Sequence, residues 1–176
     1  MKVLMVTPRV NSKDPVFGFT VSWIKELANH LEQLNIITLG QSTEVLPSNV
    51  KVYTILGNNK PGKLLNLEKL YFSLIPKNDI IFTHMYNEFA ILAWLPAKIQ
   101  GKPILVWYAH SNVNLKLFLT NMIADKLVSS NKNAFRIKSK KVKFIGQGVN
   151  IEIFKPKSKK KLKPSKTSWK PAAKRT

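Results

Sequence analysis

The sequence predicts an α/β fold with a single doubly wound, mostly parallel sheet and helices on both faces. Two observations lead to this prediction. Short apolar runs alternate along the chain with segments of helical spacing, an order typical of βαβ units. The apolar runs are nearly continuous rather than alternating in polarity. Such runs are expected of strands that a parallel sheet buries on both faces.

The elements can be assigned in order from these patterns. Strands are predicted at residues 2–7, 35–39, 50–56, 79–83, 103–108, 126–129 and 142–145. Helices are predicted at residues 21–34, 64–74, 86–100 and 113–124, with a short one at 131–138. In the first helix, apolar residues recur every three or four positions from Val21 to Leu34, which places them on one face. We therefore expect a Rossmann-like domain over residues 1–155.

Positive charge is concentrated toward the C-terminus. The net charge is +20, yet residues 1–135 hold 14 Lys and Arg against 8 Asp and Glu, whereas residues 136–176 hold 15 against 1. Residues 156–176 contain few large apolar side chains, so we predict a Lys-rich disordered tail there. Such a tail is either simply solvated or binds an anionic membrane surface or nucleic acid.

Several classes of site are excluded or unsupported. The chain has no cysteine, so it has no disulfide, thiolate ligand or cysteine nucleophile. No apolar segment reaches the length of about 20 residues that a membrane span needs. Its three histidines are scattered, and we expect neither a metal site nor a bound cofactor. We expect a cytoplasmic protein, with peripheral contact at the inner face of the membrane if the tail binds lipid.

Candidate site residues follow three of the predicted strands. Ligands of doubly wound sheets bind beyond the carboxyl ends of the strands, and these positions hold a glycine and two histidines, Gly18, His84 and His110. A glycine before a helix lets the backbone approach a phosphate, although here it is also compatible with a plain loop. A histidine at a strand end can hold a hydroxyl, a phosphate or a proton in transit. Neighbouring polar or aromatic candidates are Tyr86, Asn87, Glu88 and Ser111.

In this order the motifs resemble the N-terminal domain of family-4 glycosyltransferases of the GT-B architecture. Four stretches carry the resemblance: MKVLMVTPRV with the following glycine loop and VSWIKELANHL; DIIFTHMY; GKPILVWYAHS; and ADKLVSSNKNAFRI followed by KVKFIGQGVNIEIFKP. Each is weak alone, but together they cover residues 1 to about 156. There are departures from the family pattern. Phe17 precedes Gly18 where the family often has a second glycine, and Ser111 stands where an aspartate often follows the histidine. Gln147 and Asn150 replace the family's usual Asn and Asp.

The resemblance implies roles for these residues. It implies that the loop of Phe17, Gly18 and Phe19 faces the phosphates of a nucleotide-sugar donor and that His110 is the catalytic residue near the reacting sugar. It implies that the acceptor side is formed by His84, Tyr86, Asn87, Glu88 and Ser111. Residues 148–150 would close the domain. The acceptor would be a glycan or a lipid.

The family's second domain, which binds most of the nucleotide-sugar and carries an E-x₇-E motif, has no counterpart in the sequence. The resemblance therefore predicts a truncated or split half of a glycosyltransferase, inactive alone, with a separately encoded C-terminal half as partner. Two alternatives stay open: a non-catalytic Rossmann-like binding module that the basic tail anchors to a membrane surface, and a nucleic-acid-associated protein.

Overall fold

The computed structural model describes residues 1–146 and 148. Their strands form one seven-stranded sheet in the order β3-β2-β1-β4-β5-β6-β7, and every neighbouring pair is parallel. The strands are β1 Lys2–Thr7, β2 Gln33–Thr38, β3 Val50–Thr54, β4 Ile80–His84, β5 Ile104–Trp107, β6 Lys126–Ser129 and β7 Val142–Phe144. The helices are α1 Phe19–Asn29, α2 Lys60–Leu74, α3 Asn87–Ile99 and α4 Leu115–Ile123, with 3₁₀ turns at Ile75–Lys77 and Lys132–Ala134.

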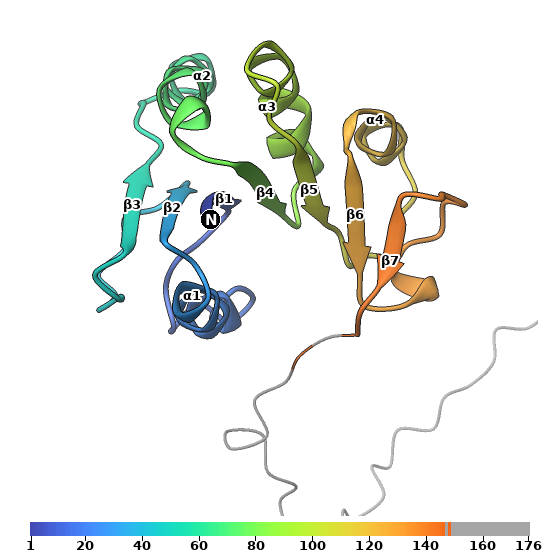
Figure 1. Cartoon of the computed structure of the whole chain (residues 1–176), viewed down its shortest axis with the longest axis horizontal. Helices are drawn as coiled ribbons and strands as arrows, with labels where there is room; N and C mark the ends of the chain where they lie inside the picture. Colours follow the sequence, from blue (N-terminus) through green and yellow to red (C-terminus); the bar gives the residue numbers. More distant parts are fainter. Residues whose placement is uncertain (147, 149–176) are drawn as a thin grey trace, which may run out of the picture.

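Helices lie on both faces of the sheet, as predicted. Figure 1 shows α2, α3 and α4 together on one side and α1 alone on the other. The central strand β1 shows why both faces need cover, because its successive side chains point to opposite faces. Leu4 and Val6 belong to the core beneath α2, α3 and α4, whereas Val3 and Met5 belong to the core beneath α1. The doubly wound α/β fold is thus confirmed.

Asparagine side chains cap the N-termini of two of the helices. The side-chain oxygen of Asn59 accepts a hydrogen bond from the backbone N–H of Gly62 at the start of α2. Asn114 does the same with the N–H of Leu117 at the start of α4. These caps satisfy donors that have no acceptor within the helix.

Helix α1 covers only part of its face of the sheet. Side chains of β4, β5 and β6 on this face are half-buried, namely Ile80, Phe82, Leu105 and Val128. They line an almost entirely apolar hollow of about 430 Å³, together with Trp23 and Leu27 of α1.

Two predicted elements end differently from expectation. The first helix was expected to reach Leu34, but α1 ends at Asn29 and Leu34 lies in β2, fully buried and paired with Val3 of β1. Pairing with the central strand therefore outweighs the continued helical spacing. The predicted helix at 131–138 is only the 3₁₀ turn, in which the side chain of Asn131 accepts the N–H groups of Asn133 and Ala134. The predicted tail at 156–176 and the end of the domain at 155 lie outside the described residues.

Candidate functional site

The candidate site lies at the carboxyl edge of the sheet, where β1, β4 and β5 end side by side. The chain runs from β1 outward through β2 and β3 and then crosses to β4 on the other side of β1. This makes the β1–β4 boundary the topological switch point, the place where doubly wound sheets bind ligands. The last residues of the two strands touch there, since the hydroxyl of Thr7 lies 3.0 Å from Nδ1 of His84.

His84 is fully buried within a group of aromatic rings. The ring centroids of Phe17, Phe19 and Trp23 lie 6.3, 5.7 and 5.5 Å from that of His84. Burial lowers the pKa of the imidazole from 6.5 to about 4, so it is neutral at pH 7. Its Nε2 has no hydrogen-bond partner among the described residues. The structure therefore holds a neutral imidazole with one unused nitrogen at the switch point, covered by aromatic side chains.

The predicted phosphate loop is already occupied by a carboxylate of the chain itself. Asp14 accepts hydrogen bonds from the N–H groups of Val16 and Phe17, at 2.9 and 2.8 Å, and these bonds lower the pKa of its carboxyl. The N–H of Gly18 donates to the carbonyl of Asp14 at 2.9 Å. A phosphate at this loop would therefore compete with Asp14 for the same backbone donors.

Gly18 is needed for close approach within this loop. Its φ is −56°, which any residue can adopt. A Cβ at this position would lie only 2.7 Å from the carbonyl oxygens of both Ser12 and Asp14. The flanking Phe17 and Phe19 are half-buried, with their rings turned onto His84.

The loop after β4 holds the one left-handed residue other than glycine in the described chain. Met85 has φ 69°, a conformation that costs roughly 1 kcal/mol or more in a residue with a side chain. Tyr86 follows it, 43% exposed, with its ring against that of Phe17. Asn87 is buried, and its Oδ1 has no partner among the described residues. In this loop the backbone N–H of Tyr86 donates to the carbonyl of His84 at 2.9 Å, and the part of Tyr86 and Asn87 in an acceptor site stays a prediction.

Glu88 and the loop after β5 lie farther toward solvent. Glu88 forms an ion pair with Lys116 of α4. Burial acts to raise the pKa of Glu88, but the hydrogen bond from Lys116, a backbone hydrogen bond and the charge of Lys116 together outweigh burial, and the pKa is lowered. His110 and Ser111 are exposed, and Nδ1 of His110 accepts the N–H of Asn112 at 3.0 Å. His110 is therefore accessible to a ligand, whereas His84 is not.

Sequence reasoning missed several residues that shape the site. Thr7 and Trp107 end β1 and β5, and the rule that directed attention to His84 would have found both. Trp23 lies between His84 and Trp107, with ring centroids 5.5 and 5.0 Å away. Only its place in the helix after the first strand could have indicated this. The sequence does show an acidic residue, Asp14, four positions before Gly18, and this could have indicated a carboxylate that binds the amides of the loop.

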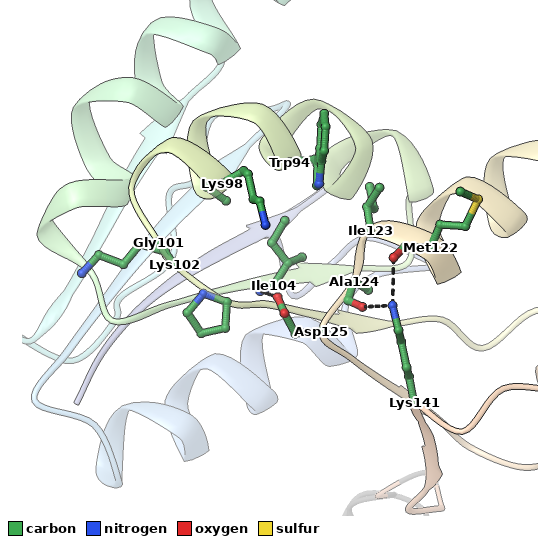
Figure 2. A pocket seen from close by; sticks show the side chains of 12 residues that line it. Trp94, Lys98, Gly101, Lys102, Ile104, Met122, Ile123, Ala124, Asp125 and Lys141 are labelled. Atoms are coloured by element: carbon green, nitrogen blue, oxygen red, sulfur yellow. Dashed lines mark hydrogen bonds between the residues drawn. The ribbon is translucent and has the colours of Figure 1, made fainter.

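The opposite, amino edge of the sheet holds a second hollow, of about 600 Å³. Figure 2 shows it between the ends of α3 and α4, with the ammonium group of Lys98 turned into it beside Trp94. Asp125 is engaged there by the N–H of Ile104 at 2.8 Å. Lys141 donates to three carbonyl oxygens at the end of α4, those of Asn121, Met122 and Ala124.

Neither a metal cluster nor a membrane span is found in the part of the chain that the structure describes. Within residues 1–146 and 148, no three His, Asp or Glu side chains gather as ligands for a metal ion. None of the helices described there combines the length and apolar character that crossing a membrane requires.

The fold is similar to that of several solved proteins. No protein-family model matches the sequence, and no curated protein is similar enough to show a family. The lipopolysaccharide outer core galactosyltransferase WaaB has a TM-score of 0.62 at 13% identity, over 86% of this chain and 47% of that protein. Anabaena HepE, solved in complex with UDP-glucose, has a TM-score of 0.61 at 14% identity, over 87% and 45%.

A UDP-GlcNAc 2-epimerase from Methanocaldococcus jannaschii shares the fold as well, with a TM-score of 0.58 at 14% identity, over 83% of this chain and 45% of that protein. The chain thus spans slightly less than half the length of each. Its described domain has the Rossmann-like fold found in one half of glycosyltransferases and epimerases that resemble it.

Proposed function

We propose that residues 1–155 are the N-terminal, acceptor-side domain of a family-4-type GT-B glycosyltransferase. The domain takes part in transferring a sugar from a nucleotide-sugar donor to a glycan or lipid acceptor. A donor-binding half completes it, either beyond this sequence or in a separately encoded chain. The observation that carries the proposal is the likeness of nearly the whole described domain to less than half of WaaB and HepE.

The geometry of the carboxyl edge supports a domain that binds the acceptor and leaves most donor binding to a second half. Exposed His110 is available as the catalytic residue facing the reacting sugar, and Ser111 beside it is available to an acceptor. In the loop of Phe17, Gly18 and Phe19, the amides of Phe17 and Gly18 are turned inward to Asp14, so this half alone binds donor phosphates weakly. Transfer in such a cleft needs charge-stabilising donors from the opposite wall.

Titration of the purified chain with UDP and UDP-glucose, followed by backbone amide NMR, tests the proposal. Weak binding is expected, with shifts at Gly18, Phe19, His84 and Ser111. Shifts confined to the hollow at the amino edge would contradict the assignment of the site. A transfer assay with a panel of nucleotide-sugars should give no multiple turnover, and turnover by this chain alone would overturn the need for a second half.

A non-catalytic binding module is the second candidate. It is favoured by one observation, the closed state of the site, in which Asp14 occupies the loop amides and aromatic rings cover His84. The same titration separates the two candidates. If no nucleotide-sugar shifts any amide at the carboxyl edge while the chain still binds another ligand, the module is the better description.

A further inference from the structure

The part of the chain that holds β6 and β7 is strongly basic. Residues 126–146 contain seven Lys and Arg and not one Asp or Glu. The seven cations are Lys126, Lys132, Arg136, Lys138, Lys140, Lys141 and Lys143. None of them forms an ion pair with a carboxylate of residues 1–146 or 148. Because this concentration of positive charge has no balancing carboxylate, it favours an anionic partner.

Six of the seven cations are exposed to solvent. The exception is the half-buried Lys141, whose ammonium group donates to three carbonyl oxygens at the end of α4. Asp125, the acidic residue just before this segment, is engaged by the N–H of Ile104. The six exposed cations are therefore available to a ligand from outside.

These cations follow one edge of the sheet. β7 is the last strand at this edge (Figure 1), and Lys143 is its middle residue. In the segment that leads into β7, Phe135 and Ile137 pack against the core beneath α2, α3 and α4. The residue after each of them, Arg136 and Lys138, is exposed. Packing of the apolar side chains thus directs the neighbouring charges toward solvent.

An aromatic side chain is exposed among these charges. Phe144 ends β7 directly after Lys143 and is 38% exposed. Exposed rings beside cations are typical of proteins that hold single-stranded nucleic acid, because bases stack on the rings while the cations contact the phosphates. We call the following residues the basic edge: Lys126, Lys132, Arg136, Lys138, Lys140, Lys143 and Phe144.

We propose that the basic edge binds a single-stranded nucleic acid, with its cations at the phosphates and the ring of Phe144 stacked on a base. A duplex fits less well, because its major groove admits a helix or a two-stranded ribbon. The basic edge instead consists of a 3₁₀ turn, a loop and residues of two short parallel strands. The inference does not rest on the proposed function.

Other partners of the basic edge are disfavoured by its structure. An acidic peptide could add to the sheet as a further strand, but β7 is three residues long with a lysine in its middle. Short edge strands that carry lysine resist such addition. A second copy of the chain is disfavoured by charge, since each copy carries a net +20 and like charges repel.

Fluorescence anisotropy of a labelled oligothymidylate of about 15 nucleotides, titrated with the full chain at several salt concentrations, tests the proposal. Lys138→Gln combined with Lys140→Gln should lower the affinity about 5- to 20-fold at low salt. The same pair should reduce the slope of log K against log salt concentration by about 1.4, because each lost contact with a single strand removes about 0.7.

A matched pair of substitutions at the other edge of the sheet is the control. Lys51 of β3 and Lys63 of α2 are also exposed. Changing both to Gln removes the same charge and should alter the affinity by less than about twofold, because salt screens charges that lie far from the bound strand. Equal effects of the two pairs would show that net charge alone matters and would overturn the proposal.

A further pair separates the basic edge from the lysines near the C-terminus. Lys159→Gln combined with Lys161→Gln should reduce the salt slope by less than the pair at Lys138 and Lys140 does. The reverse order would place the main contact in residues 149–176 and refute binding by the basic edge.

The stacking contact has its own readout. Phe144→Leu keeps an apolar side chain but removes the ring, so it should weaken binding about fivefold and leave the salt slope unchanged. Phe72→Leu, at a ring that is 48% exposed on α2, should have no effect. Tighter binding to a duplex of the same length would contradict the proposal. If polyglutamate displaces the oligonucleotide at an equal concentration of charge, the edge is a general site for acidic chains and the proposal is overturned.

Discussion

The buried His84 gives the folded chain a defined sensitivity to acid. Its folded-state pKa is about 4, against 6.5 when unperturbed, because of burial. Between these values the unfolded chain binds a proton that the folded chain does not. The stability due to neutral His84 is therefore complete above pH 6.5 and is lost as the pH falls toward 4. A difference of about 2.5 pKa units (6.5 minus about 4) corresponds to about 3 kcal/mol in the free energy of unfolding.

Urea unfolding at a series of pH values measures this effect. Tryptophan fluorescence is a suitable signal, because Trp23 packs against His84. Carboxylates also titrate over this range, so the test is the difference between the parent chain and His84→Asn, in which the amide can still reach Thr7. The variant should lose about 3 kcal/mol less than the parent between pH 7 and pH 4. The same substitution at exposed His30 is the control. If His84→Asn keeps the full pH dependence of the parent, the reasoning is refuted.

Two substitutions test structural features by the same unfolding assay. Gly18→Ala should lower the free energy of unfolding by about 1–3 kcal/mol, because its Cβ would lie 2.7 Å from two carbonyl oxygens. Gly148 lies in open space, so Gly148→Ala should leave the free energy of unfolding unchanged. Equal effects of the two substitutions would contradict the close-approach argument. Lys141→Met should cost about 2 kcal/mol, because its ammonium group donates to three carbonyl oxygens at the end of α4. Lys140→Met is the control for Lys141, and a loss of the same size there would show that charge alone matters.

The strands were predictable because their signal is local and strong. Continuous apolar runs such as residues 2–7 predict buried parallel strands, and the structure confirms all seven at nearly the expected positions. The end of α1 was not predictable in the same way. Leu31 and Leu34 continue its helical spacing, and only the pairing of Leu34 with Val3 places this residue in a strand. Long-range pairing of this kind leaves no mark in local spacing.

The location of the candidate site could be predicted from the sequence, but the burial of its residues could not. The strand-end rule located His84 and His110 from topology alone. It could not show that one would be buried and the other exposed. That difference arises from the rings of Phe17 and Phe19, which a loop of this chain folds over His84. The roles of the two histidines in binding or catalysis stay predictions.

The strand order also sets a constraint on how the chain is made. β1 is the first strand to be synthesised, yet it occupies the centre of the sheet, between β2 and β4. Its Val3 pairs with Ile80, so the middle of the sheet cannot close until β4 has left the ribosome. A nascent chain must therefore keep an apolar strand with an unpaired edge until β4 has been made. We expect folding dominated by such distant contacts to be slow and dependent on chaperones that shield that edge.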